Sequence, residues 1–217
     1  RSAVKVPNDL KPEIAALFGC AVMTGVGCVV NTAKVAAGES VVIFGLGGIG
    51  LAALLGAVAA GANPIVAVDV LPAKLELAKS LGATHVIPAN DDTVAKVREL
   101  TQGGALYAIE TVGSEKVLAQ AYAATRRGGT TLTVGLPHPS KQFSISAVSL
   151  VAEERTVKGS YMGSAVPTRD IPRFVRLYQA GRLPVDRLLS HTLKLDDINE
   201  GFDRLAKGEA VRQVILF

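Results

Sequence analysis

The sequence has little of what several functional classes require. Aromatic residues make up 5% of its 217 residues, and the basic residues are dispersed, with only Arg126 and Arg127 adjacent. A nucleic-acid surface usually combines a basic stripe with stacking aromatics, so we expect no nucleic-acid partner. The two cysteines, Cys20 and Cys28, are too few for a disulfide framework, which favours a reducing, cytoplasmic environment.

Charged residues are absent from Val41 to Val68, a run long enough to span a bilayer. Glycines and an Asn63-Pro64 pair interrupt this run and divide it into a β-branched piece, an Ala/Leu piece and a second β-branched piece. Buried parallel strands also read as continuous apolar runs. The run therefore predicts strand, helix and strand in a protein core, and we expect no membrane partner.

With 49% hydrophobic and 19% charged residues, the composition suits a globular protein with a sizeable core. Short strands and helices alternate along the middle of the chain, an order typical of a doubly wound parallel α/β sheet. Six strands are expected at 41–44, 65–68, 84–87, 105–110, 130–134 and 155–159. Helices are expected between them at 49–60, 72–81, 91–100 and 114–125. Ligands of such Rossmann sheets lie beyond the carboxyl ends of the strands.

The two ends of the chain depart from this alternation. A helix from about Ala15 to Ala36 precedes the sheet. After Gly163 the pattern indicates a helix near 171–180, a strand near 191–195, a helix near 197–206 and a final strand at 211–217. We interpret residues 38–163 as a nucleotide-binding domain, and residues 1–37 and 164–217 as segments that pack against or belong to another lobe.

A glycine-rich turn joins the first strand to the first helix of the sheet. Gly45, Gly47 and Gly50 match the pattern G-x-G-x-x-G, with Gly48 beside them. The first glycine allows a tight turn, the second lets the backbone approach a pyrophosphate, and the third lets helix and strand pack closely. The amides of the first helical turn, together with the helix dipole, then hold the phosphates.

An acidic residue follows the second strand, 19 residues after Gly50. In dinucleotide-binding folds an acid at the place of Asp69 accepts hydrogen bonds from the adenosine ribose, and it repels a 2′-phosphate. The next residue is Val70, where an NADP enzyme often places a base, so we expect NAD rather than NADP. Methyltransferases share this layout, but their glycine loop usually follows an acid, and Val41–Phe44 contains none.

Beyond the glycine loop, several stretches resemble the medium-chain dehydrogenases, specifically the zinc-containing alcohol dehydrogenases. They occur in the order of that family and cover nearly the whole chain. The stretches are residues 19–25 (GCAVMTG), 67–69 (AVD), 79–85 (KSLGATH), 134–137 (VGLP), 157–160 (VKGS), 198–203 (INEGFD) and 209–212 (EAVR).

The resemblance implies a role for individual residues. Cys20 corresponds to the last of three protein ligands of a catalytic zinc, and Thr24 to a catalytic-site residue that packs on the nicotinamide. Ile49 would lie against the back face of the cofactor. Asp69 and Lys74 would hold the adenosine ribose. The nicotinamide end would be formed by Thr111, Val112, Val134, Gly135, Leu136, Ser160, Tyr161 and Met162.

Arg212, near the C-terminus, would reach the pyrophosphate, a use that suits a forked guanidinium. In the family, zinc acts as a Lewis acid on the alcohol oxygen, and NAD accepts the hydride. The resemblance therefore implies oxidation of small-molecule alcohols or reduction of aldehydes. It also implies that residues 1–37 end, and residues 164–217 return to, a catalytic domain.

The resemblance is incomplete at the N-terminal side, where the sequence starts at Arg1-Ser2 without a methionine. The family's N-terminal lobe supplies the other two zinc ligands, the proton relay and a structural zinc loop. Catalytic zinc needs three protein ligands, so Cys20 alone cannot hold it. We expect a fragment or separate lobe that binds dinucleotide but does not turn over alcohol unaided, with zinc only in the complete enzyme.

Without that lobe, we expect apolar surface to be exposed along Ala15–Cys28 and along the C-terminal segments, and such patches promote association. In the family, the sixth strand pairs with its counterpart across a two-fold axis. An edge strand left open invites pairing. The sequence therefore predicts a homodimer or a higher homo-oligomer.

Two other functions stay open at this point. A non-catalytic NAD-binding module would explain the missing lobe, but such a module has no use for a zinc ligand at Cys20. A zinc-free quinone or enoyl reductase of the same superfamily usually lacks this cysteine and often prefers NADPH. Cys20 and Asp69 therefore favour the zinc-containing alcohol dehydrogenase.

Overall fold

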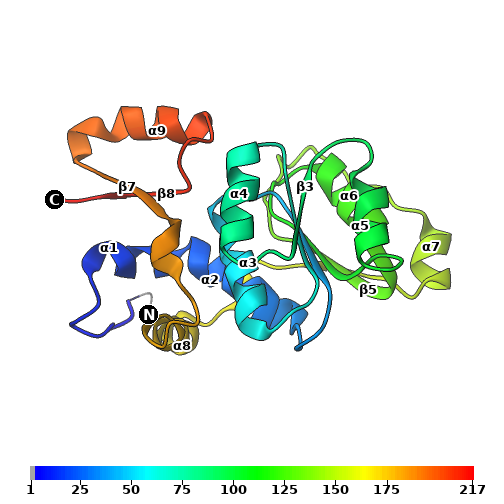
Figure 1. Cartoon of the computed structure of the whole chain (residues 1–217), viewed down its shortest axis with the longest axis horizontal. Helices are drawn as coiled ribbons and strands as arrows, with labels where there is room; N and C mark the ends of the chain where they lie inside the picture. Colours follow the sequence, from blue (N-terminus) through cyan, green and yellow to red (C-terminus); the bar gives the residue numbers. More distant parts are fainter. Residues whose placement is uncertain (1–2) are drawn as a thin grey trace.

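A six-stranded parallel sheet forms the centre of the computed structural model, which describes residues 3–217 (Figure 1). The strand order is β3-β2-β1-β4-β5-β6, so the predicted doubly wound fold is confirmed. All five pairings between neighbouring strands are parallel. The strands are β1 (Val41–Phe44), β2 (Ile65–Asp69), β3 (His85–Pro88), β4 (Ala105–Glu110), β5 (Thr125–Thr133) and β6 (Thr156–Gly159).

Helices cover both faces of the sheet. On one face α3 (Gly48–Ala60) and α4 (Pro72–Ser80) bury their apolar residues in the larger core. On the other face α5 (Thr93–Leu100) and α6 (Glu115–Ala124) pack over β1, β2 and β4. The uncharged run at 41–68 is β1, α3 and β2, buried throughout its strands, as predicted. This arrangement explains why the run carries no charge, because both of its faces meet apolar side chains.

The prediction of a single helix over residues 15–36 is wrong. The segment divides into α1 (Pro12–Ala15), the 3-10 helix η1 (Ala16–Gly19), α2 (Ala21–Gly27) and the π-helix η2 (Cys28–Ala33). The chain leaves helical geometry at Cys20, with φ −139° and ψ −78°. Gly19 precedes this break, and glycine is a poor helix former. The bend gives α2 a direction of its own, so that it can lie across α3.

The prediction that Ala15–Cys28 exposes apolar surface is also wrong for α2. Every residue of Ala21–Gly27 is buried, because this helix is surrounded by α3, η3 (Met162–Ser164) and α8 (Pro167–Gln179). Among residues 3–217, no single helix is both long and apolar enough to cross a membrane. The pair Pro12–Gly19 and Ala21–Ala33 passes the same test only when taken together, with a bend of 53° between them.

Small residues allow α2 and α3 to cross at close range. A Cβ atom on Gly25 would lie 2.4 Å from the carbonyl oxygen of Ile49 and 2.7 Å from the Cβ of Ala52. On the next turn, Gly56 of α3 faces Val26 of α2. The crossing brings the segment after Cys20 against the start of α3, which is the element that follows the glycine loop.

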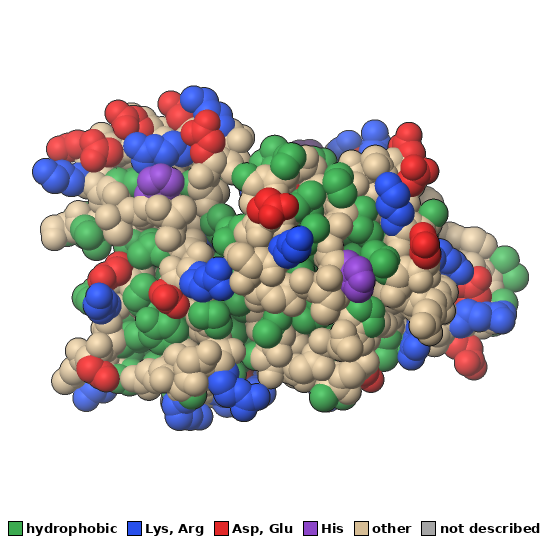
Figure 2. Space-filling model, viewed as in Figure 1, with side chains coloured by type: hydrophobic (Ala, Val, Ile, Leu, Met, Phe, Trp, Pro, Cys, Tyr) green, Lys and Arg blue, Asp and Glu red, His purple; other side chains and the backbone are tan. Residues whose placement is uncertain are grey.

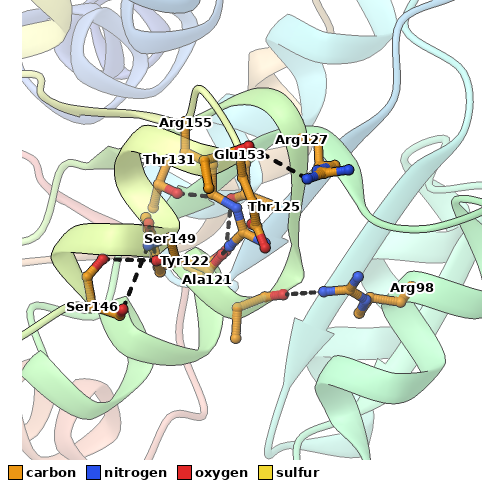
Figure 3. A network of polar contacts seen from close by, with 12 residues as sticks. Arg98, Ala121, Tyr122, Thr125, Arg127, Thr131, Ser146, Ser149, Glu153 and Arg155 are labelled. Carbon is orange, nitrogen blue, oxygen red and sulfur yellow. Dashed lines mark hydrogen bonds and ion pairs between the residues drawn. The ribbon is translucent and has the colours of Figure 1, made fainter.

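At the far edge of the sheet, β5 begins at Thr125, five residues before the expected start. A short helix that the sequence pattern did not predict, α7 (Ala147–Ala152), precedes β6. Arg155 anchors this edge: its guanidinium lies 4.8 Å from the centroid of the Tyr122 ring and pairs with Glu153 (Figure 3). The edge strand β6 itself is exposed along its length.

The C-terminal part lies beside the sheet rather than in it (Figure 1). Its strands β7 and β8 form a separate two-stranded parallel sheet, next to helix α9. Its elements are η3 (Met162–Ser164), α8 (Pro167–Gln179), η4 (Val185–Leu188), β7 (Leu189–Leu193), η5 (Leu195–Asp197), α9 (Ile198–Ala206) and β8 (Arg212–Ile215). Exposed apolar side chains gather here, as expected, at Leu195, Phe202, Leu205, Leu216 and Phe217.

We predict that Gly25→Ala destabilises the fold, because its methyl group would meet backbone atoms of α3 that cannot move independently. Overpacking of this kind typically costs about 1–3 kcal/mol. Gly19→Ala is the matched control, since a Cβ atom there meets nothing within 4 Å. Thermal unfolding of both variants checks the prediction, and equal midpoints for the two would contradict it.

Candidate functional site

The strand order places a crevice at the carboxyl ends of β1 and β4, where the order of successive strands reverses from one side of β1 to the other. Ligands of open α/β sheets bind at this topological switch point. A cavity of about 350 Å³ opens there, between the turns that follow β1, β2 and β4. Seven residues predicted for the cofactor site line it: Gly45, Gly47, Asp69, Val70, Lys74, Thr111 and Val112.

The glycine turn has the geometry that its sequence predicts. Gly45 adopts φ +90°, a conformation that side chains disfavour. A Cβ atom on Gly50 would lie 1.8 Å from the carbonyl oxygen of Gly45, so the helix can start only if this residue is glycine. Gly47, in contrast, faces open space, with nothing within 4 Å of a Cβ atom. The turn therefore leaves room beside Gly47, directly before the first turn of α3.

Asp69 closes the same cavity from the end of β2. Its carboxylate accepts hydrogen bonds from the backbone amides of Leu46, at 2.6 Å, and Leu71, at 3.0 Å. An ionised carboxylate offers about four lone-pair positions, so this group can accept further hydrogen bonds from a ligand. Val70, directly after it, is 71% exposed and carries no charge that could meet a phosphate.

Arg212 reaches the glycine turn from β8, more than 160 positions away in the sequence. A Cβ atom on Gly48 would lie 2.3 Å from Nε of Arg212, so the guanidinium packs directly on the turn. This Nε is buried and has no hydrogen-bond partner among residues 3–217. Burial lowers the pKa of the Arg212 guanidinium, and the nearby Cys20 acts in the opposite direction. A half-buried cation with a buried, unused donor beside a helix start favours an anionic ligand.

The turn after β4 is held in place by a buried carboxylate that the sequence pattern did not single out. Glu110, at the end of β4, is 1% exposed. One of its oxygens accepts hydrogen bonds from the amides of Val112, at 2.7 Å, and Gly113, at 2.6 Å. Its other oxygen accepts one from the hydroxyl of Thr133, at 3.1 Å. Glu110 thus ties the turn after β4 to β5.

Gly135 packs against Gly113, so the predicted Val134–Leu136 segment lies beside this turn. An acidic side chain that ends an otherwise apolar strand at the switch point was the available signal for Glu110. Leu71, Ala89 and Gln120 also line the cavity without having been predicted. Leu71 lies two residues after β2 and Ala89 directly follows β3, so the same rule about strand ends could have found these two.

Another group of predicted residues lies outside this cavity, around α2. Thr24 is buried, and its hydroxyl faces the sulfur of Met162 at 3.8 Å. Ile49 sits where α3 meets Gly25. Ser160 is buried with its hydroxyl 2.8 Å from that of Thr32, whereas the side chain of Tyr161 is 76% exposed. The structure therefore places two groups of predicted residues, one at the switch point and one around α2.

The two cysteines have different environments. Cys20 is exposed at the start of α2, whereas Cys28 is buried and donates a hydrogen bond to the carbonyl oxygen of Gly25. Burial raises the pKa of the Cys28 thiol to about 12. Within residues 3–217, no three His, Cys, Asp or Glu side chains are grouped closely enough to hold a metal ion. These residues therefore do not by themselves form a zinc site.

We predict that iodoacetamide modifies Cys20 but not Cys28 in the folded protein at pH 8. The thiolate is the reacting species. Cys28 is shielded, and pH 8 lies far below the pKa of its thiol, so the thiol stays protonated. Mass spectrometry should show one added group in the native protein, two after unfolding in urea, and none in native Cys20→Ser. Modification of Cys28 at a rate similar to that of Cys20 would contradict the prediction.

The sequence profile described as "Zinc-binding dehydrogenase" matches residues 48–180. Among characterised relatives, the chain is 39% identical to a geraniol dehydrogenase of Castellaniella defragrans, across 100% of this chain and 58% of that protein. It is 42% identical to an NDMA-dependent alcohol dehydrogenase of Amycolatopsis methanolica, across 99% of this chain and 59% of that protein.

Solved structures show the same likeness. The chain matches benzyl alcohol dehydrogenase from Acinetobacter calcoaceticus with a TM-score of 0.95 and 38% identity, over 98% of this chain and 59% of the other. The chain therefore spans somewhat less than two thirds of the length of the proteins that it matches. The profile match and the similarity along nearly the whole chain show that this protein belongs to the zinc-binding dehydrogenase family.

Proposed function

We propose that this chain binds NAD and forms the cofactor-binding portion of an alcohol dehydrogenase that interconverts alcohols and aldehydes. One observation carries the proposal: a glycine turn leaves open space beside Gly47, and Arg212 lies over it with an unpartnered, buried Nε. Such a cradle fits a pyrophosphate group, which accepts hydrogen bonds from a helix start and from a guanidinium fork.

The adenosine end of the cofactor would lie in the cavity next to Asp69. Its carboxylate is fixed in place by two backbone amides and keeps lone pairs for the ribose hydroxyls. Lys74, from the first turn of α4, lines the same cavity. A 2′-phosphate would meet the negative charge of Asp69 and the uncharged Val70, which supports NAD over NADP.

The nicotinamide end would lie between the turn at Thr111–Val112, the Val134–Leu136 segment, and the Thr24 side of α2. When bound, NAD supplies the acceptor for the hydride that leaves the alcohol carbon. The chain itself would fix the position of the nicotinamide ring. Glu110 holds the turn after β4, and Ile49 and Thr24 limit the space on the side of α2. Ser160, Tyr161 and Met162 would close the same end.

Cys20 is proposed as one of three protein ligands of a catalytic zinc in the complete enzyme. Its thiol is exposed beside the cradle and lies near Arg212. Three protein ligands are needed for such a site, and the described residues bring no three such donors together. Zinc binding at Cys20 would therefore require ligands from outside the described residues.

We further propose that residues 38–163 form the NAD-binding domain and that residues 1–37 and 164–217 belong with a catalytic domain. A homodimer or higher oligomer is supported by the exposed edge strand β6 and by the apolar side chains around α9. The two free thiols fit a cytoplasmic location.

We predict that the chain binds NADH more tightly than NADPH, and that Asp69→Asn removes this preference. The variant loses the charge that repels a 2′-phosphate and an acceptor for the ribose, so NADH affinity should fall about tenfold. Nicotinamide fluorescence during titration measures both affinities, with the exposed acid variant Asp92→Asn as control. Tight NADPH binding by the unmodified chain would contradict the expected specificity.

We predict that Gly47→Ala folds normally but loses most of its affinity for NADH. A methyl group there meets no protein atom, yet it occupies the space proposed for the pyrophosphate. Thermal unfolding should give an unchanged midpoint, while the dissociation constant rises about tenfold or more. Gly159→Ala, whose Cβ also meets nothing within 4 Å, is the matched control. Unchanged affinity in Gly47→Ala would mean that phosphates do not approach this turn.

A further inference from the structure

A second, larger cavity lies away from the glycine turn, between η2, the end of α3, and α8. Its volume is about 1000 Å³, and it shares no lining residue with the cavity at the switch point. Five basic side chains line it: Lys34, Arg169, Arg173, Arg176 and Arg182. We refer to it as the basic cavity. Nothing in the proposed cofactor site uses these residues.

The positive charge of the basic cavity is poorly compensated within the protein. Among residues 3–217 no Asp or Glu lines the cavity, and Asp170 beside it on α8 is buried and already accepts hydrogen bonds from the amide of Val166 and from Arg169. Arg173 lies 4.0 Å from the same carboxylate. Lys34, Arg176 and Arg182 have no acidic partner among residues 3–217. Because like charges repel one another, this group of cations costs folding free energy unless an anion joins it.

The cations surround an apolar floor. Arg169, Arg173 and Arg176 stand at positions i, i+4 and i+7 of α8 and therefore share one side of that helix. Lys34 faces them from the end of η2, where it adopts φ +59°. Basic side chains gather along the lower edge of the molecule, beside α8 (Figure 2). Between them lie the apolar residues Val26, Val30, Val35, Ala59, Ala60 and Leu177.

We propose that the basic cavity binds a soluble organic polyphosphate. Three uncompensated cations on separate elements call for several negative charges on one molecule, more than a single carboxylate offers. Guanidinium groups pair with phosphate oxygens in a two-pronged geometry, and four of the five cations are arginines. The apolar floor suits the organic body of such a ligand, and the volume lies at the upper end of small-molecule sites.

The position of the cavity also links it to the proposed cofactor site. Ser164 lines the cavity and accepts a hydrogen bond from the hydroxyl of Thr32, which also contacts Ser160. Gly163 packs directly on Gly27 of α2. An anion held between η2 and α8 therefore bridges the two segments that carry Thr24 and Met162. By thermodynamic reciprocity, any effect of the anion on NADH affinity must equal the effect of NADH on anion affinity.

Calorimetric titration with inorganic tripolyphosphate tests the proposal. We expect saturable binding and a rise in the unfolding midpoint, because a ligand of the folded state stabilises it. Arg176→Ala/Arg182→Ala should weaken this binding about tenfold or more, since both side chains are exposed and removing them leaves the core intact. Arg126→Ala/Arg127→Ala, a variant with the same loss of charge elsewhere on the surface, should bind like the unmodified chain.

Three results would overturn the proposal. Equal weakening in both double variants would show that affinity follows net charge alone. Loss of binding in Arg212→Ala, with full binding in Arg176→Ala/Arg182→Ala, would place the anion at the glycine turn. Co-sedimentation with phosphatidylglycerol vesicles, without tripolyphosphate binding, would make the cavity a membrane contact. Since the Asp69 and Gly47 variants test NAD binding separately, either proposal can fail while the other stands.

Discussion

The structure depends on the contact between Gly50 and the carbonyl oxygen of Gly45, which leaves only three residues between the end of β1 and the start of α3. Only two glycine residues permit this approach, since a single Cβ atom at Gly50 would occupy the position of the carbonyl. The contact aims the first turn of α3 into the crevice at the switch point. Around that turn gather the amide of Leu46 with Asp69, the guanidinium of Arg212, and, through Gly25, helix α2. Moving the helix start would displace all three.

Most of the sheet could be predicted from the sequence because its signals are local. Continuous apolar runs mark β1 and β2, and glycines mark the ends of α3 and α4. The early start of β5 was missed because Arg126, Arg127 and two glycines lack strand character, and pairing with β4 overrides that local preference. The break at Cys20 was missed because apolar periodicity continues across it, although the backbone does not.

The residues of the candidate site likewise divide into those that could be predicted from the sequence and those that could not. Residues adjacent to strand ends, such as Gly47 and Asp69, could be predicted to lie together because the topology rule brings strand ends together. The position of Arg212 depends on the path of the chain through α8, β7 and α9, and sequence spacing cannot supply that path. Glu110 ends an otherwise apolar strand, but most of its partners are backbone amides, so no spacing of side chains indicates what it holds. For Arg212, only the resemblance to a family indicated where the residue would go.

Arg212 stands on β8, which belongs to the small β7–β8 sheet and not to the sheet that carries the glycine turn. The distance from its guanidinium to the turn is therefore set by how two separate sheets are oriented, with few covalent constraints between them. Any ligand that contacts both the turn and Arg212 therefore holds the two sheets together. Conversely, a rotation of the β7–β8 sheet would move Arg212 away from the turn without altering a bond inside the six-stranded sheet, so access to this site depends on how the two sheets are oriented.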